Sequence, residues 1–296
     1  MKRIATAMFF ILSWALPLWG QTPEQKQSTV KWLQELQVAD GGFIPAPVDA
    51  RLDTNPKGGL RATSSALRAL KYFGGSPKDK SAAAKFVASC YDATSGGFAD
   101  QPGGKPDVFS TAVGLMASVE VGVKPESVEK SVTFMAENAK DFEEIRIAAA
   151  GMEAVGQLAP HAERWRRYLQ GRANQDSSFG QGSEKPRATG GTVVAILRLG
   201  GKVEHPDKVI EILNQGQNKD GGFGKDDTGA SDLESSYRIT RCHHMLNAKP
   251  ARVDALKDFI AKCRNADGGY GVQPGKPSTV SGTYFAGIIL HWLGEP

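Results

Sequence analysis

The sequence has few cysteines, no run of one charge and no long hydrophobic stretch beyond its first twenty residues. Its three cysteines, Cys90, Cys242 and Cys263, are an odd number without C-x-x-C spacing, which suits neither a disulfide scaffold nor a zinc cluster and favours buried thiols. A net charge of +4 with interspersed signs gives no basis for binding nucleic acid. Of the 296 residues, 40% are hydrophobic and 23% charged, which indicates a globular protein.

The first twenty residues predict a secretory signal peptide. Met1-Lys2-Arg3 form a short basic start, residues 4–18 are mostly apolar and uncharged, and polar sequence follows from Gln21. The stretch is short for a membrane span, and nothing later in the chain is apolar for long enough to cross one. Since Leu18-x-Gly20 departs from the A-x-A cleavage pattern, an uncleaved N-terminal anchor is the alternative. In both cases we expect residues 21–296 to form one domain outside the cytoplasm, periplasmic or secreted.

Glycine is abundant, with 34 copies, and much of it falls in a repeated turn that ends in an aromatic residue. The copies read ADGGF at 39–43, SGGF at 95–98, QDSSF at 175–179, KDGGF at 219–223 and ADGGY at 266–270. We interpret Asp141-Phe142 as a sixth copy that has lost its glycines. Six units of similar length therefore fill the chain after the leader.

Each unit has the same internal order of helix, glycine turn and helix. The first helix is amphipathic, as in residues 253–263, where apolar residues recur at three-or-four spacing. The second is apolar on nearly every side, as in residues 192–197 and 283–290, and a helix without a polar face must be surrounded by protein. No strand pattern competes, and closing the ring leaves no exposed apolar end. The sequence predicts an all-α fold, a closed α/α toroid of six inner and six outer helices built from six helix-hairpin repeats.

The turn at residues 218–223, Asn-Lys-Asp-Gly-Gly-Phe, followed by an inner helix, resembles the repeat of protein prenyltransferase β subunits and, more distantly, of squalene-type terpenoid cyclases. Residues 268–294, with Gly-Gly-Tyr-Gly, a Pro-Gly pair, Thr-Tyr-Phe-Ala-Gly and Leu-Gly in order, are similar to the closing repeat of the geranylgeranyltransferase type II β subunit. The resemblance covers the whole chain after the leader. It is specific for the α/α toroid and much less specific for one chemistry.

The predicted ring has a chemical consequence at its mouth. Because every outer helix returns the chain, the six inner helices run the same way and their N-termini converge at the rim that carries the glycine turns. Converging N-termini favour anions such as diphosphates or carboxylates. We expect an apolar funnel below that rim, which suits a ligand with a charged head and a hydrophobic tail.

The resemblance implies a zinc site, of which this sequence keeps one of three ligands. The family holds zinc with an Asp, a Cys two residues later and a His on the last inner helix, and these positions fall on Asp232, Glu234 and Gly282. Glu234 could bind a metal as a carboxylate, but Gly282 offers no side chain, and two oxygens make a weak, open site. Asp232 and Glu234 are therefore the candidates for a catalytic or metal-binding role. Zinc is the expected cofactor if the protein is catalytic, and otherwise we expect none.

The diphosphate-binding residues of the family are also replaced. Its Arg, Lys and Tyr fall on Asp226, Gly229 and Ser235, and a carboxylate at the first position would repel a diphosphate. The family's His in the fourth unit falls near Arg187, after a one-residue gap, and a guanidinium there could still hold an anion. The acidic D-x-D-D signature of the cyclases is missing.

Five further side chains are candidates for ligand binding. Arg61, Arg187 and Arg238 lie near the starts of inner helices, where a cation faces an unfavourable dipole. They form either an anion-binding rim or ion pairs across neighbouring inner helices, and the candidate acids for those pairs are Glu234, Glu143 and Glu144. Tyr237 and Tyr284 line the funnel or belong to the ordinary core, and Phe109 and Phe285 are open to the same two interpretations.

Three functions remain compatible with the sequence. The first is an extracytoplasmic toroid that binds a hydrophobic or anionic small ligand, or a peptide or protein at its rim, without catalysis. The second is a prenyltransferase-like enzyme that moves an isoprenoid from a diphosphate to an acceptor, with metal on Asp232 and Glu234 and the anion on Arg187. The third is a cyclase-like or hydrolytic enzyme whose acids are Glu143, Glu144, Asp232 or Glu234. We favour the first, because the family's site is degenerate and prenyl diphosphates are cytoplasmic.

Overall fold

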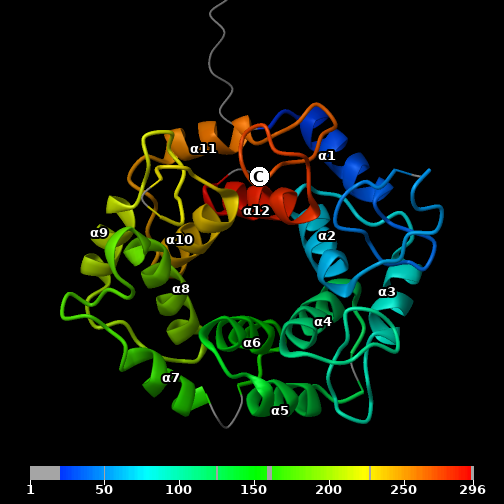
Figure 1. The fold of residues 1–296 in the computed structure, drawn as a ribbon, viewed down its shortest axis with the longest axis horizontal. Helices are drawn as coiled ribbons and strands as arrows, with labels where there is room; N and C mark the ends of the chain where they lie inside the picture. The colour runs from blue at the N-terminus through cyan, green and yellow to red at the C-terminus, as the bar shows by residue number, and fades with distance from the viewer. Residues whose placement is uncertain (1–20, 50, 125, 159–161, 227, 295–296) are drawn as a thin grey trace, which may run out of the picture.

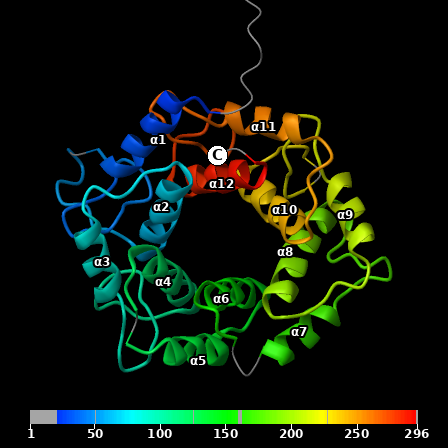
Figure 2. The same ribbon diagram turned by 180° about the vertical axis from the view of Figure 1, so that it is seen from behind.

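The computed structural model describes residues 21–49, 51–124, 126–158, 162–226 and 228–294. Its helices form two concentric rings, as Figure 1 shows and as Figure 2 shows from behind. The outer ring contains α1 (Pro23–Glu35), α3 (Lys80–Ser89), α5 (Val128–Asn138), α7 (Ala162–Gln170), α9 (Pro206–Gln215) and α11 (Val253–Lys262). The inner ring contains α2 (Leu60–Tyr72), α4 (Val108–Val121), α6 (Phe142–Val155), α8 (Lys185–Arg198), α10 (Leu233–Met245) and α12 (Val280–Trp292). The predicted closed toroid of six inner and six outer helices is confirmed.

Strands and membrane spans are both missing from these ranges. Residues on either side of the turns pair only through isolated β-bridges. Within the same ranges no helix combines the length and apolarity that crossing a bilayer requires. The predicted signal peptide, residues 1–20, lies outside the described residues and stays a prediction.

The two rings differ in burial as the hydrophobic pattern predicts. The outer helix α11 buries three of its 10 residues, all on one stripe, and the inner helix α12 buries nine of 13. An amphipathic helix with one apolar stripe needs one protein neighbour, whereas a helix that is apolar all round needs protein on every side. The inner ring is therefore the packed middle layer between the outer helices and the central space.

The ring closes between the last repeat and the first. The inner helix α12 packs against both α10 and α2. In the outer layer, the Thr29 hydroxyl of α1 donates to the Gly268 carbonyl oxygen in the last turn, at 2.7 Å. Behind this contact the Phe73 and Tyr270 rings stack with centroids 6.1 Å apart. The first and last hairpins therefore meet through both layers.

The turn glycines place each repeat against the next outer helix. Gly41, Gly221 and Gly268 have φ angles of +91°, +95° and +96°, which side chains rarely adopt. A Cβ at each of the three would lie 2.0 to 2.7 Å from a carbonyl oxygen of the next outer helix. These oxygens belong to Ala82 for Gly41, Ala255 for Gly221 and Ser28 for Gly268. The same contact thus joins consecutive repeats and also joins the last repeat to the first.

Each turn is tied to its own inner helix by a hydrogen bond that the sequence analysis did not identify. The backbone N–H of the turn aromatic residue donates to a buried hydroxyl in the first turns of the inner helix. The pairs are Phe43 with Thr63, Phe98 with Thr111, Phe179 with Thr189, Phe223 with Ser236 and Tyr270 with Thr283, at 2.9 to 3.1 Å. Because these amides are buried, each would otherwise lack a partner.

The interpretation of Asp141-Phe142 as a sixth glycine turn is wrong. Asp141 is the N-cap of α6, since its Oδ1 accepts from the Glu144 N–H at 2.9 Å, and Phe142 is the first residue of that helix. The outer helix α5 ends at Asn138, so residues 139–141 alone connect it to α6. The third repeat therefore has no turn of the glycine type. An Asp near an aromatic residue occurs both in the glycine turns and at the N-cap of α6. The spacing along the sequence does not distinguish these two structures.

The glycine contact at the closure predicts a stability difference between two substitutions. Gly268→Ala is expected to lower the free energy of unfolding by more than about 3 kcal/mol, because backbone strain adds to a clash with helix α1. Gly275→Ala is the matched control, since Gly275 has φ +76° and no atom within 4 Å of its added Cβ. That control should cost only about 1 to 2 kcal/mol, the strain alone. Chemical denaturation measures both, and equal losses would contradict the proposed role of the contact.

Candidate functional site

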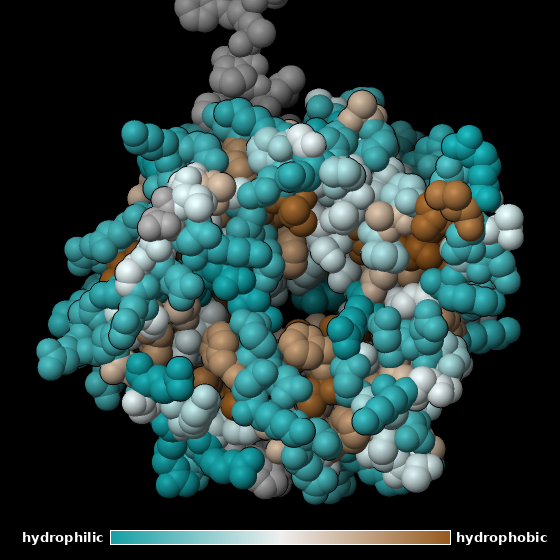
Figure 3. Space-filling view, viewed as in Figure 1, coloured by the Kyte–Doolittle hydropathy of each residue, from teal (hydrophilic) through white to brown (hydrophobic). Residues whose placement is uncertain are grey.

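A central cavity of about 350 Å³ lies inside the inner ring. Figure 3 shows the surface hollowed at the centre of the ring, with hydrophilic and hydrophobic residues mixed around the opening. The charged lining residues are Arg68, Arg146, Arg198, Arg238 and Arg241 with Glu120, Glu153 and Glu234. The aromatic lining residues are Tyr72, Tyr237, Tyr284 and Phe285. The expectation of an apolar funnel is therefore corrected to a mixed wall, in which five arginines and three glutamates lie among apolar and aromatic residues.

Asp232, the one retained zinc ligand of the family motif, serves as the N-cap of α10. Its Oδ1 accepts from the Ser235 N–H at 2.8 Å and its Oδ2 accepts from the Ser235 hydroxyl at 2.9 Å. Asp107 makes the same two hydrogen bonds with Ser110 at the start of α4, at 2.7 and 2.9 Å. Since an N-cap carboxylate satisfies backbone N–H groups of the first helical turn, the structure explains Asp232 without a metal.

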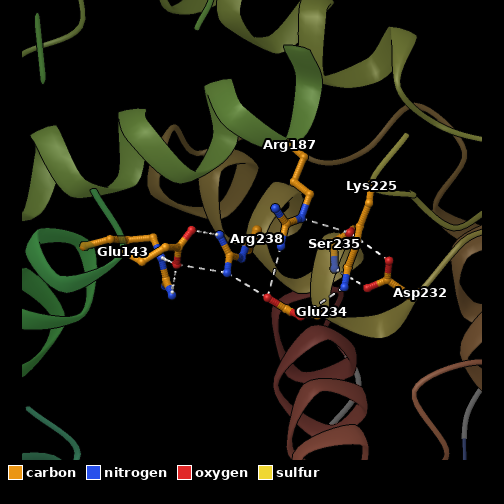
Figure 4. Close-up of polar contacts among 8 residues, drawn as sticks. Glu143, Arg187, Lys225, Asp232, Glu234, Ser235 and Arg238 are labelled. Carbon is orange, nitrogen blue, oxygen red and sulfur yellow. Dashed lines mark hydrogen bonds and ion pairs between the residues drawn. The ribbon is translucent and has the colours of Figure 1, made fainter. Parts of the chain in front are cut away.

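Glu234, the second metal candidate, lies among three cations (Figure 4). Its Oε1 accepts from Arg238 at 2.7 Å and from Arg187 at 3.1 Å, and the Lys225 ammonium is 3.8 Å from its Oε2. Arg187 also donates through Nε to the Ser235 hydroxyl at 3.1 Å. Each carboxylate oxygen of Glu234 therefore already has a positively charged neighbour.

The ion pairs continue from α10 to α6. Arg238, whose side chain is 10% exposed, donates to both oxygens of Glu143 at 2.7 and 3.1 Å, and Arg146 approaches the same carboxylate at 2.9 Å. We call Glu143, Arg146, Arg187, Glu234 and Arg238 the rim network. It joins α6, α8 and α10 near their N-terminal ends, on one side of the mouth.

The rim network keeps its carboxylates ionised. Burial would raise the pKa of Glu143, but the hydrogen bond from Arg238 and the charges of Arg146 and Arg238 outweigh it and hold that pKa at about 2. Burial likewise opposes ionisation of Glu234, and Arg238 and Arg187 reverse this and lower its pKa. A general acid must carry its proton near the working pH. Neither glutamate therefore suits the role of the acid in a cyclase-like or hydrolytic mechanism.

The remaining rim candidates are also engaged. Arg61 pairs with Asp107 at 2.9 Å and lies over the Phe109 ring at 5.5 Å, with its side chain half exposed and outside the central cavity. Glu144 accepts from the Lys140 N–H at 2.7 Å. The ion pairs that the sequence offered as the alternative to an anion-binding rim are thus present, with Asp107 in place of a glutamate for Arg61.

A zinc ion does not fit the three residues at the family's metal positions. Asp232 caps a helix, Glu234 is paired with cations, and a Cβ on Gly282 would lie 2.5 Å from the Tyr270 carbonyl oxygen. No side chain can therefore be added at that position of α12 without moving the last turn. Across the ranges that the structure describes, no three His, Cys, Asp or Glu residues are grouped so as to hold a metal ion.

The second end of the cavity contains residues that the sequence analysis missed. Arg198 and Arg241 both contact Glu153 at 2.9 Å, and Arg68 lies 4.5 Å from the Tyr284 ring centroid. One signal was available for Arg241, because it falls at three-or-four spacing after Tyr237 and Arg238 on the same helix face. Arg68 and Arg198 carry no such signal, since which side of an inner helix faces the centre depends on the closed ring.

The comparisons with known proteins agree with the architecture. The family model of the prenyltransferase alpha-alpha toroid domain matches residues 1–78, 68–136 and 147–295. The chain belongs to this family. The matched ranges omit residues 137–146, which contain the short connection where the third glycine turn is missing. A search of curated protein sequences finds no match.

Three solved structures resemble this toroid. A Candida albicans protein geranylgeranyltransferase-I complexed with GGPP is 14% identical, with 90% of each chain covered and a TM-score of 0.72. A protein from Actinoplanes is 13% identical, with 91% of this chain and 98% of that chain covered and a TM-score of 0.62. The type II terpene cyclase MstE from Scytonema, in complex with geranylgeranyl dihydroxybenzoate, is 12% identical over 91% and 96%, with a TM-score of 0.60. At these identities the likeness establishes the fold alone.

The rim network predicts a pH-dependent stability difference. Because the pKa of Glu143 is lowered from 4.5 to about 2, its ionised form stabilises the fold above pH 4.5, and the contribution is lost as the pH falls towards 2. Glu143→Gln should therefore be less stable than the wild type near neutral pH, and the difference should close over that acid range. Denaturation curves at several pH values measure it. Glu144→Gln, which removes a carboxylate of the same helical turn that contacts no arginine, is the control and should show a smaller difference.

Proposed function

We propose that this toroid is a binding protein that takes a small hydrophobic anion into its central cavity, without zinc-dependent transfer chemistry. The observation that carries the proposal is the wall of the cavity, where arginines and tyrosines lie together. A cavity of about 350 Å³ lies near the lower end of the ~300–1,000 Å³ usual for small-molecule sites. Its enclosure by the inner ring suits a small ligand better than a peptide or folded partner at the rim.

Both parts of such a ligand have complementary residues in the wall. The rings of Tyr237, Tyr284 and Phe285 contact one another, with centroids 5.0 to 5.8 Å apart, and offer an apolar surface. The guanidinium groups are donors to a carboxylate or phosphate. The similar structures from Candida albicans and Scytonema, described with GGPP and geranylgeranyl dihydroxybenzoate, make an isoprenoid a reasonable hydrophobic part.

The prenyltransferase-like alternative requires a metal on Asp232 and Glu234 and an anion on Arg187. The helix cap and the ion pairs of these three residues oppose it, because each would have to be broken before a metal or diphosphate could bind.

We further propose that the protein acts outside the cytoplasm, on the strength of the basic and apolar N-terminal sequence. Because prenyl diphosphates are cytoplasmic, the natural ligand of a protein outside the cytoplasm would not come from that pool.

The metal alternative has a direct test with a matched control. Asp232→Ala and Asp107→Ala remove the same kind of helix cap and should each cost about 1 kcal/mol of stability, since the exposed ion pair of Asp107 with Arg61 adds little. Added zinc should not raise the melting temperature of the wild type or of either variant. Elemental analysis should find less than stoichiometric zinc. Stoichiometric zinc that is lost in Asp232→Ala and kept in Asp107→Ala would overturn the non-catalytic proposal.

Ligand binding is tested by calorimetry with three probes in the presence of a chelator. Geranylgeranyl diphosphate should bind more tightly than either geranylgeraniol or pyrophosphate, because only the first has both a hydrophobic and an anionic part. Phe285→Ala should weaken geranylgeranyl diphosphate more than pyrophosphate, since Phe285 belongs to the aromatic wall. If geranylgeraniol binds as tightly as the diphosphate, or if none of the three binds, the proposed function is wrong.

A further inference from the structure

We propose that the anionic group of the ligand binds at the far end of the cavity, on Arg68 and Arg241 beside Tyr237 and Tyr284, and not at the rim where the inner helices begin. This inference rests on the proposed function and locates the ligand within the cavity. We call Arg68, Arg198, Arg241, Tyr237 and Tyr284 the far cluster. Its members come from α2, α8, α10 and α12, and its three arginines lie in the second halves of their helices.

The arginines at the rim are already paired with carboxylates. Arg187 pairs with Glu234, Arg146 pairs with Glu143, and Arg238 contacts both glutamates. A ligand anion that bound there would have to displace these carboxylates or be repelled by them. The rim therefore has no arginine without a carboxylate partner, although three arginines share two glutamates and the helix N-termini converge on it.

Arg68 differs from the rim arginines in its partners. Its guanidinium lies 3.3 Å from the Met116 sulfur and over the Tyr284 ring, and among the described residues no carboxylate forms an ion pair with it. Glu120, near the end of α4, lines the same cavity and its charge helps to raise the pKa of Arg68, but its ion pair is with Lys71 at 3.1 Å. Arg68 is thus a cation in the cavity wall with donor groups available to an incoming anion.

Arg241 is only partly neutralised. It shares the single carboxylate of Glu153 with Arg198, whose side chain is 4% exposed, so two cations face one acid. Its guanidinium also lies over the Trp292 ring at 5.2 Å, and its Nε, which is buried, has no hydrogen-bond partner in the structure as described. The far cluster therefore carries more positive than negative charge.

The hydroxyl of Tyr284 is the second, independent observation. Tyr284 is 5% exposed and lines the cavity, and its hydroxyl lies beside the Tyr237 hydroxyl without a hydrogen bond of ordinary geometry to any residue that the structure describes. Buried polar atoms in native proteins nearly always have a partner. A carboxylate or phosphate held by Arg68 would accept from this hydroxyl, because Arg68 already lies against the same ring.

The ionisation of Tyr237 reports the same positive potential. Burial raises the pKa of this phenol, but the charges of Arg198, Arg241 and Arg68, together with the Tyr284 hydroxyl beside it, outweigh burial and lower the pKa below its ordinary value. Burial raises the pKa of Tyr284, its neighbour. The charged and titratable groups that line the cavity or contact its aromatic wall are Arg68 and Tyr72 on α2, Glu120 on α4, Arg146 and Glu153 on α6, Arg198 on α8, Glu234, Arg238, Arg241 and His244 on α10, and His291 on α12. The lowered pKa of Tyr237 thus follows from the excess of arginine around its phenol.

A simpler explanation accounts for part of the cluster. Cations near the C-terminal ends of helices interact favourably with the helix dipole, and Arg198 and Arg241 lie towards such ends. The dipole supplies no acceptor, however, for the Arg241 Nε or for the Tyr284 hydroxyl. A ligand anion supplies both, with its hydrophobic part lying along Tyr237 and Phe285 towards the rim.

The test follows the ionisation of Tyr237 by ultraviolet difference absorbance, with inorganic phosphate as the probe and chloride at equal ionic strength as the reference. The wild type should show one tyrosine that titrates below the ~10 of a free phenol, and Tyr237→Phe should lack it. Saturating phosphate should raise that pKa by about one unit, a tenfold change in proton affinity, because the bound anion disfavours the phenolate. Phosphate should accordingly bind more weakly as the pH rises through the pKa of Tyr237.

The variants separate the far cluster from the rim. Arg68→Gln and Arg241→Gln should abolish the phosphate effect, whereas Arg61→Gln, which removes a cation from the rim end of α2, should keep it. Arg68→Lys and Arg241→Lys retain the charge and should keep part of the effect, which separates lost binding from lost folding. A pKa that phosphate leaves unchanged in the wild type, or an effect lost in Arg187→Gln and kept in Arg68→Gln, would sink the proposal. In the second case geranylgeranyl diphosphate would still bind, and the proposed function would stand with the anion at the rim.

Discussion

The close approach of a left-handed glycine to the next outer helix is the contact on which the rest of the structure depends. Where a glycine turn is present it sets the position of the next hairpin, and at Gly268 it brings the last hairpin back to helix α1. At Gly268 the positive φ angle and the lack of room for a Cβ beside helix α1 both require glycine. A row of amphipathic hairpins would otherwise expose an apolar face at each end. Once the ring is closed, the direction of every inner helix and the position of the cavity follow.

Closure also concentrates charge in a small enclosed space, and the two ends of the cavity resolve this differently. At the rim, glutamates of α6 and α10 sit between the arginines, so each of the three arginines has a carboxylate partner. At the far end one glutamate faces two arginines, and Arg68 lies against the Met116 sulfur and the Tyr284 ring without an ion pair to any described carboxylate. Helix dipoles favour anions at the first end and cations at the second. The helix dipoles alone would place a bound anion at the rim, whereas the side chains favour the far end.

The sequence was sufficient for the fold because its signals are local. The three-or-four spacing of apolar residues marks each helix, and paired glycines mark the turns, so the repeat is readable without knowing any distant contact. The same locality explains the failures. Asp141-Phe142 reads like a turn and is a helix cap, and the hydroxyl that binds each turn amide lies in a different element from the amide. Arg68 and Glu153 could not be assigned to the cavity, since the face that an inner helix turns to the centre is set by its two neighbours in the ring.

The retained aspartate shows why a surviving motif residue is weak evidence for surviving chemistry. Asp232 matches the family's metal position, yet Asp107 makes the same bonds at the start of α4, where the family motif places no metal. An inner helix needs a cap whether or not it also needs a ligand. The position of the third ligand is more informative, because Gly282 packs against the Tyr270 carbonyl and cannot regain a side chain without shifting the closing turn. The packing of the last turn against α12 therefore leaves no space for the side chain that the family's third ligand requires.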